Sequence, residues 1–345
     1  MKSPNLREKD KLVLTQVVES YLREGKPVSS DLITRKGILH DSPATIRNIM
    51  VKLEDQGYIL KPHASAGRIP TDKGLRYYVN SLMDSIRSTK GTQVFTENLL
   101  SGKGDFNSLL NRVSRILAEQ SDNLSFVISP RVSKLAFHHL RFIKVAEDKV
   151  MVILLTTFNL VLNEIVRTTQ YFTQVELDEA SQFINTSFRG KNLLFVRDYL
   201  RRELPRYRRR HEAVINKLME LLRSYFVQED QDDQIFFQGT SKLLEQAEQF
   251  SLDKLKLLFQ DFEEKAKLAR LISDFISLDR VKVLIGSEVD LPDVADCTLI
   301  LSHYGSPNQV LGSLGIIGPK RIAYKKIIPL VDYIAQGLSQ TVSKA

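Results

Sequence analysis

The side chains best suited to chemistry lie on one side of a predicted helix over residues 43–56. Its apolar residues recur at helical spacing and form the side expected to be buried, namely Ile46, Ile49, Met50 and Leu53. The opposite side carries small, hydroxyl, amide and cationic groups, namely Ala44, Thr45, Arg47, Asn48 and Lys52. In the major groove of DNA, arginine pairs with guanine, asparagine pairs with adenine, and methyl-sized groups contact thymine. The pattern predicts a recognition helix, although an ordinary amphipathic helix with a solvated face has the same spacing.

Roles can be assigned to these side chains by their chemistry. We expect Thr45, Arg47 and Asn48 to contact base edges, because they carry hydrogen-bonding groups near the start of the helix. We expect Ser42 and Lys52 to contact phosphates. Ser42 is followed by proline, which is well tolerated at the first helical position, so the helix should begin here.

A short hairpin is predicted directly after this helix. Residues 58–62 have the pattern of a strand, residues 63–67 that of a turn, and residues 68–70 that of a returning strand. Glycine lets a backbone approach a ligand closely, and arginine binds phosphates or a narrow groove. The candidate DNA contacts of the hairpin are therefore His63, Ser65, Gly67 and Arg68. A plain turn residue is the alternative for Arg68, and an ordinary hairpin side chain is the alternative for His63.

Three further helices must position these groups. Apolar residues at helical spacing predict a first helix that ends at Gly25. The cluster Ser29-Ser30-Asp31 can cap a short second helix that ends at Gly37. Thr71 can cap a fourth helix, which runs to Ile86. Together with the hairpin, these elements predict a winged helix-turn-helix over residues 1–87.

The charge distribution agrees with a DNA-binding N-terminus. The net charge is +8; residues 1–90 hold 16 Lys/Arg against 10 Asp/Glu, and the other 255 residues hold 33 against 31. Neutralising phosphates supplies most nonspecific affinity for nucleic acids. The excess of positive charge therefore favours a nucleic-acid partner for this part of the chain, although a mildly basic solvated surface has the same balance.

Length and composition limit the class of protein. A chain of 345 residues predicts two or three domains, and 43% hydrophobic residues are enough to build cores. Cys297 is the only cysteine, so an intramolecular disulfide and a thiolate metal cage are excluded. No apolar run approaches the ~18 residues of a membrane span. We expect a soluble, cytoplasmic, nucleoid-associated protein that does not bind membranes.

The remaining sequence predicts a mixed α+β domain. Residues 88–105 are polar and glycine-rich and are expected to be a linker. The expected elements, in chain order, are a helix at 106–119, strands at 124–128, 135–145, 150–155 and 160–167, a helix at 176–188, strands at 281–285, 298–303 and 310–317, and a helix at 323–338. We expect one sheet, built from 106–190 and 256–345 and completed across an inserted helical segment at 191–255.

No enzymatic site is predicted. Gly312, Gly315 and Gly318 lack the lysine of a phosphate-binding loop, so sheet turns or bulges explain them better. His138 and His139 are neighbours on a predicted strand and point to opposite faces, which disfavours a shared metal. Cys297 is better explained as a buried strand residue than as a nucleophile. We therefore expect no catalytic residues, no cofactor and no metal.

Several runs resemble the heat-inducible transcription repressor HrcA family. They are Pro27-Val28-Ser29-Ser30, residues 42–50 with Leu53-Glu54 and Gly57, residues 62–71, and, more loosely, residues 239–244, 283–288 and 314–321 with Tyr324. Ser29 stands where the family commonly has glycine. The resemblance implies a winged-helix domain, a GAF-like domain, and a dimerising segment inserted into the latter. It also implies an inverted-repeat operator of the CIRCE type upstream of chaperone operons, and regulation by the GroEL-type chaperonin.

The expected function is thus that of a homodimeric repressor that occupies an inverted repeat in double-stranded DNA and blocks transcription. Two other functions fit the same residues. The GAF-like domain could bind a small molecule and so make the protein a regulator of other genes. The winged helix could instead serve as a docking module for proteins, in which case DNA binding would be absent.

Overall fold

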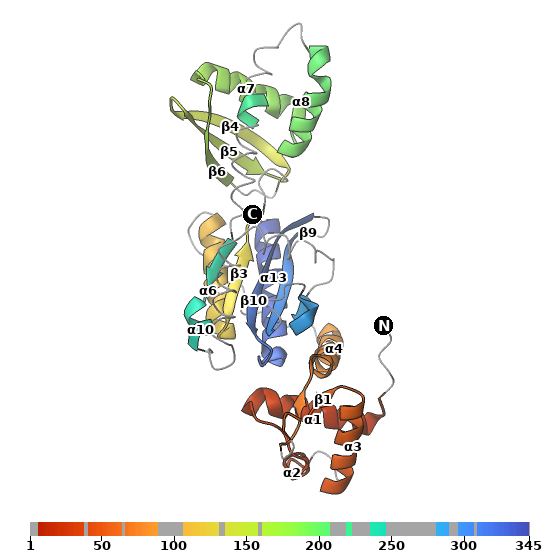
Figure 1. Cartoon of the computed structure of the whole chain (residues 1–345). Coiled ribbons are helices and arrows are strands. Elements are labelled where there is room, and N and C mark those ends of the chain that lie inside the picture. The colour runs from red at the N-terminus through yellow and green to blue at the C-terminus, as the bar shows by residue number, and fades with distance from the viewer. Residues whose placement is uncertain are drawn as a thin grey trace.

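The structure is a computed structural model in which the elements form three tiers (Figure 1). The described residues are 6–37, 41–63, 66–88, 106–130, 135–157, 161–207, 219–222, 235–245, 281–289, 296–306 and 309–344. The N-terminal module, residues 6–88, lies at one end. A five-stranded sheet with its helices occupies the middle, and a three-stranded sheet with two long helices lies at the other end (Figure 1).

The N-terminal module has the order of elements that the sequence predicts. It contains α1 (Glu8–Glu24), α2 (Ser30–Arg35), α3 (Pro43–Asp55), β1 (Ile59–Leu60), β2 (Ile69–Pro70) and α4 (Asp72–Ser88). The two strands are antiparallel and pair Ile59 with Pro70 and Leu60 with Ile69. They are shorter than expected, and Pro62 lacks the N–H group that would extend the ladder.

The core of this module comes from helix faces whose apolar residues recur every three or four positions. Val13, Leu14 and Val17 of α1 are fully buried against Ile46, Met50 and Leu53 of α3, and all six have 0% exposure. Helix α1 ends as predicted at Gly25, whose positive φ of 69° lets its N–H bond the carbonyl of Tyr21. These contacts fix which face of α3 points outward.

The middle tier is an antiparallel sheet with the strand order β7-β3-β10-β9-β8. Its strands are β3 (Leu124–Ile128), β7 (Ile235–Gln238), β8 (Val281–Ile285), β9 (Cys297–Ser306) and β10 (Gln309–Pro319). Helices α6 (Phe106–Ser121) and α13 (Tyr324–Lys344) pack against each other and against this sheet. The short elements α10 (Thr240–Glu245) and η3 (Gly286–Glu288) follow β7 and β8. Every predicted helix and strand of this tier is confirmed, with ends shifted by a few residues.

The third tier shows that the expected single sheet is wrong. Strands β4 (Phe137–Ala146), β5 (Lys149–Thr156) and β6 (Val161–Arg167) pair only with one another among the described strands. Helices α7 (Gln174–Phe188) and α8 (Leu193–Tyr207) share a separate core with them. Strand β7, which lies within the expected insertion 191–255, instead joins the middle sheet. Alternating apolar residues predict a strand and its buried face, but not its partner strand.

Two other expectations concern residues that the structure describes only in part. Residues 89–105 of the expected linker lie outside the described residues, as do 208–218, 223–234 and 246–255 of the expected insertion.

Among the described residues, no helix is both long enough and apolar enough to cross a membrane.

The glycines of β10 have a structural explanation, as expected. The pairing register of β10 with β9 shifts between Val310 and Gly312, which marks a β-bulge. A Cβ atom at Gly315 would overlap the carbonyl oxygen of Ile300 and lie 2.8 Å from the ring of Phe126. Glycine at this position therefore permits close packing inside the sheet.

We expect Gly315→Ala to lower the free energy of unfolding by about 1–3 kcal/mol, because the added methyl group overpacks the sheet. Urea denaturation followed by circular dichroism measures this change. Gln120→Ala, at an exposed position of α6, is the control and should change the free energy by less than about 0.5 kcal/mol. Equal stability of Gly315→Ala and the parent would contradict the packing described here.

Candidate nucleic-acid interface

Helix α3 begins with a complete N-terminal cap. The Ser42 hydroxyl accepts a hydrogen bond from the backbone N–H of Thr45 at 3.2 Å, and Pro43 occupies the first helical position. Ser42 Oγ also lies 3.0 Å from Thr45 Oγ1. The first turn of the helix, which carries Ala44 and Thr45, is therefore fixed before any ligand binds.

The predicted base-reading residues share the exposed side of α3. Ala44, Thr45, Arg47 and Asn48 are all exposed. Ile46 and Met50, on the opposite side of the same helix, are fully buried. The structure therefore brings these four residues together on one face. Neutral and cationic donors on an outward helix face can bind the edges of bases in a major groove.

Val51 is a further residue of this face that the sequence analysis did not select. Its side chain is 42% exposed, and it lies one helical turn after Arg47 and Asn48. An apolar group at this place can contact a thymine methyl group. The helical spacing from Arg47 was the signal that could have identified it.

The structure gives Lys52 a partner within the protein. Its Nζ donates to Asp10 Oδ2 of α1 at 2.5 Å, and the Asp10 side chain is 6% exposed. Lys52 itself stays 43% exposed, so its ammonium group is not enclosed. The pair attaches α3 to α1 at the end of α3 that is farther from Thr45.

The hairpin arginine also has an intramolecular partner. Arg68 Nε donates to Glu54 Oε2 at 3.0 Å, and its side chain is only 12% exposed. The backbones of Arg68 and Val28 exchange two hydrogen bonds of 2.8 and 2.9 Å. A Cβ atom at Gly67 would lie 2.5 Å from the Val28 carbonyl oxygen, so glycine here permits this close approach.

The remaining hairpin candidates are described in part. His63 is exposed at the end of the described part of the hairpin, and Ser65 lies outside the described residues. The structure thus groups Ala44, Thr45, Arg47 and Asn48, and it places Arg68 in contact with Glu54 rather than with them.

Burial perturbs two titratable groups that attach α1 to its neighbours. Desolvation raises the pKa of Tyr78 to about 12, and the nearby Glu19 carboxylate acts in the same direction. Desolvation lowers the pKa of Lys36, and the charge of Arg23 acts in the same direction. Lys36 Nζ donates to Ser20 Oγ at 2.5 Å. Both groups help to hold together the helices that support α3. Neither lies on the outward face of α3.

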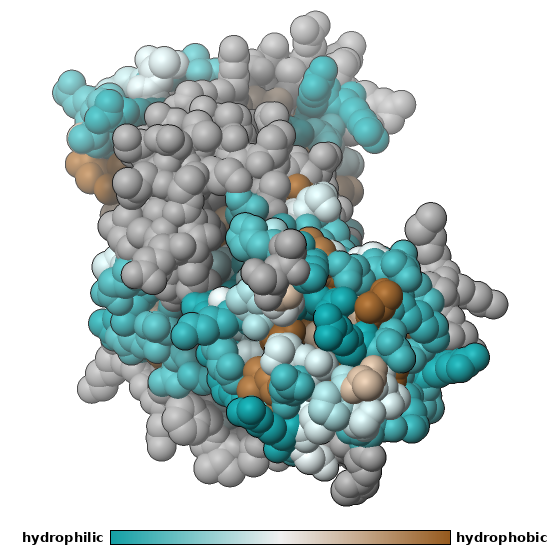
Figure 2. All heavy atoms as spheres, turned by 60° about the horizontal axis from the view of Figure 1, so that its bottom comes forward, coloured by the Kyte–Doolittle hydropathy of each residue, from teal (hydrophilic) through white to brown (hydrophobic). Residues whose placement is uncertain are grey.

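The surface at this end of the molecule is mainly hydrophilic. Figure 2 brings this end forward and shows apolar residues there only at scattered positions. Among the described residues, no group of three His, Cys, Asp or Glu side chains is arranged to hold a metal ion. The arrangement can offer hydrogen-bond donors and small apolar groups to a polar ligand.

The matching family model and the similar relatives name one family. Residues 107–328 match the family model described as HrcA protein C terminal domain. A relative from Geobacter sulfurreducens, named heat-inducible transcription repressor HrcA, is 34% identical over 97% of this chain and 98% of its own length. A relative of the same name from Xanthomonas axonopodis pv. citri is 34% identical over 97% of this chain and 96% of its own.

A solved structure has the same fold over the whole length. It is the crystal structure of a hypothetical protein, with a TM-score of 0.68 and 24% sequence identity. The match covers 99% of this chain and 99% of the other.

We expect Lys52→Met to lower the free energy of unfolding by about 1–3 kcal/mol, because it leaves the buried Asp10 carboxylate unpaired. Urea denaturation measures the change. The matched variant Asp10→Asn/Lys52→Met removes both charges and should recover most of the loss. Full stability of Lys52→Met would show that the ion pair does not hold α3 to α1.

Proposed function

The chain belongs to the HrcA family of heat-inducible transcription repressors, and from this premise we propose that α3 is the recognition helix of a winged helix-turn-helix. One observation carries the proposal. Ala44, Thr45, Arg47 and Asn48 share the outward face of a helix whose opposite face is fully buried. A helix held in this way can enter a major groove with its N-terminal half toward the bases.

Each side chain then has a distinct role. Arg47 donates to the N7 and O6 atoms of guanine, and Asn48 pairs with adenine. Ala44, Thr45 and Val51 present methyl groups to thymine, and Thr45 also has a hydroxyl group for a base edge. Ser42 and the half-exposed Lys52 lie at the two ends of this face, where phosphates of the groove walls pass.

The hairpin supplies the wing. His63, Ser65, Gly67 and Arg68 approach the phosphate backbone or the minor groove beside the site that α3 reads. Because Arg68 is held by Glu54, its direct contribution requires this ion pair to exchange for a phosphate contact. The same pair keeps the hairpin close to α3 in the free protein.

The operator is an inverted repeat, because a two-fold symmetric dimer presents two identical recognition helices. The family resemblance implies dimerisation through the inserted segment, residues 191–255. Because α8 of this segment shares a core with the three-stranded sheet, we propose that the second copy binds the opposite face of that sheet. On this face Ile143, Met151 and Ile165 lie directly opposite one another across the three strands. Ile165 is 43% exposed and Val161 is 59% exposed. An identical face on a second copy would bury these two exposed side chains.

The repressor acts in the cytoplasm, at the nucleoid, on operons that encode chaperones. Bound at the inverted repeat, the dimer blocks transcription by occupying the promoter region. A GroEL-type chaperonin binds exposed apolar surface and so raises the fraction of active repressor until damaged proteins occupy it. We propose that the five-stranded sheet, together with α6 and α13, is the GAF-like domain.

Replacing the base-reading residues should remove sequence preference. Arg47→Ala and Asn48→Ala should each lose about 1–3 kcal/mol of preference for the inverted repeat over a scrambled duplex, because one bidentate base contact is lost. Fluorescence anisotropy at fixed salt measures both affinities. Gln56→Ala, at the exposed end of the same helix, should keep the parental preference. Parental preference in both of the first two variants would contradict the assignment of α3.

Charge on the open sheet face should prevent self-association. We expect Ile165→Asp to shift the protein from dimer to monomer in sedimentation velocity, because a carboxylate would be buried against its own copy. Gln340→Asp, at an exposed position of α13, introduces the same charge away from this face and is the control. A dimeric Ile165→Asp variant would place the interface elsewhere.

The chaperonin contribution can be measured with the same operator. Repressor refolded with chaperonin and ATP should contain a larger DNA-binding fraction than repressor refolded alone. Stoichiometric titration at a DNA concentration well above Kd measures this fraction. Equal fractions in both samples would contradict the proposed dependence on the chaperonin.

A further inference from the structure

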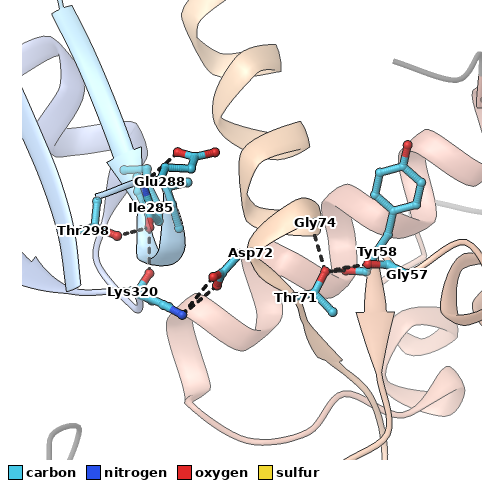
Figure 3. Close-up of polar contacts among 10 residues, drawn as sticks. Gly57, Tyr58, Thr71, Asp72, Gly74, Ile285, Glu288, Thr298 and Lys320 are labelled. Carbon is cyan, nitrogen blue, oxygen red and sulfur yellow. Dashed lines mark hydrogen bonds and ion pairs between the residues drawn. The ribbon is translucent and has the colours of Figure 1, made fainter. Parts of the chain in front are cut away.

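Helix α4 contributes ion pairs to the contact between the N-terminal module and the domain of the five-stranded sheet. In the first turn and a half of α4, Asp72 pairs with Lys320, which follows β10 (Figure 3), and Arg76 pairs with Glu288 of η3. These contacts are not used by the DNA-reading face. A role for these contacts in orienting that face rests on the proposed function.

The first contact joins Arg76 of α4 to Glu288 of η3 and to the backbone of β8. Arg76 Nε donates to Glu288 Oε1 at 2.7 Å, and its Nη2 donates both to Glu288 Oε2 and to the carbonyl oxygen of Val283, the latter at 2.6 Å. Glu288 Oε2 also accepts from the N–H of Ile285 at 2.9 Å. Both partners are thus held by further bonds, and a two-pronged arginine–carboxylate contact fixes direction as well as distance.

The second contact joins Asp72 of α4 to Lys320. Lys320 Nζ lies 2.8 Å from Asp72 Oδ1 and 3.0 Å from Asp72 Oδ2. The backbone of Lys320 is itself anchored, because the buried Tyr324 hydroxyl donates to its carbonyl oxygen at 2.8 Å. Tyr324 also lies 2.8 Å from Thr298 Oγ1 of β9. The lysine is therefore fixed to the middle sheet.

Two glycines, one in each domain, leave room for the side chains of Lys320 and Arg321. Gly286 has φ of +56°, and a Cβ atom there would overlap Asp72 Oδ2 and lie 2.7 Å from Lys320 Nζ. Gly25 has φ of +69°, and a Cβ atom there would overlap the guanidinium of Arg321. Residues 320 and 321 belong to a run that the sequence analysis singled out without a role. The structure places both at the contact between the two domains.

Thr71, directly before α4, is bonded to the residues that follow α3. Thr71 Oγ1 donates toward the carbonyl oxygens of Gly57 and Tyr58, at 2.7 and 3.0 Å, and accepts from the N–H of Gly74 at 3.2 Å (Figure 3). A side chain at Gly74 would overlap the Tyr58 carbonyl oxygen. A continuous set of directional bonds therefore runs from the residues after α3, through residues 71–76, to the sheet.

Apolar packing alone would not define this orientation. Leu75 and Val79 of α4 are buried in a hydrophobic cluster that also contains Ile285 and Ile327 of the middle tier. Such burial is not directional, so it holds the two domains together but allows them to turn. The ion pairs, at partly exposed positions, add little stability but select one orientation.

We propose that Asp72, Arg76, Glu288 and Lys320 are positioning residues that set the spacing between operator half-sites. They fix the direction of each recognition helix relative to the sheet domain, and through it relative to the second copy in the dimer. A dimer with rigidly held helices accepts half-sites at one separation on the DNA, whereas a dimer with loosely held helices tolerates several.

The test compares two variants on three duplexes. The duplexes carry the inverted repeat, the repeat with its centre lengthened by about 5 base pairs, which is half a helical turn, and a single half-site. Lys320→Glu reverses one charge of the contact. Lys325→Glu, at an exposed position in the first turn of α13, is the matched control with the same change in net charge.

The parent and Lys325→Glu should bind the native spacing at least about tenfold more tightly than the lengthened one, whereas Lys320→Glu should discriminate by about twofold or less. Affinity for the single half-site should be equal in Lys320→Glu and Lys325→Glu. The double variant Asp72→Lys/Lys320→Glu restores opposite charges and should recover the discrimination. Should Lys320→Glu fail to fold by circular dichroism, Arg76→Gln removes the other ion pair and is expected to behave in the same way.

Three results would overturn the inference. The first is parental discrimination of spacing in folded Lys320→Glu and Arg76→Gln. The second is a parallel loss of half-site affinity, which would mean that the contact only stabilises the module. The third is a parent protein that does not prefer the repeat to a scrambled duplex; this result contradicts the proposed function itself and is recognised before any variant is measured.

Discussion

The burial of one side of α3 is the constraint on which the rest of the N-terminal module depends. Ile46, Met50 and Leu53 have no exposed surface, and their contact with α1 leaves only one face of α3 free to meet a ligand. The Ser42 cap fixes where the helix begins, and the pair of Lys52 with Asp10 fixes its far end. A helix that is fixed at both ends and on one side can present its outward groups without reorganisation, which lowers the cost of binding.

Much of this could be predicted from the sequence because it is local. Apolar residues three and four apart gave the helices, and Gly25 marked the end of α1. The partners of side chains could not be predicted in this way. Lys52 and Arg68 have the charge that phosphates require, but their nearest carboxylates, Asp10 and Glu54, come from other parts of the fold. Likewise, alternation identified β4, β5 and β6 as strands but did not show that they form a sheet of their own.

In the proposed repressor, each of the three tiers has its own role. The N-terminal module would read bases with a small set of side chains, and the three-stranded sheet would bind a second copy through its exposed apolar residues. The middle tier connects them, and its contact with α4 combines non-directional burial with directional ion pairs. Specificity for an inverted repeat needs all three, because two weakly discriminating helices become selective only when their separation and direction are fixed.

Protection of guanine N7 from dimethyl sulfate tests the central claim most directly, since this atom lies in the major groove and is the proposed acceptor for Arg47. A chaperone-operon inverted repeat is treated with the reagent with and without saturating protein. The account predicts protected guanines at symmetric positions in both half-sites, on successive major-groove faces. Unchanged methylation throughout both half-sites, with the repeat fully bound, would show that α3 does not read the major groove and would contradict the account.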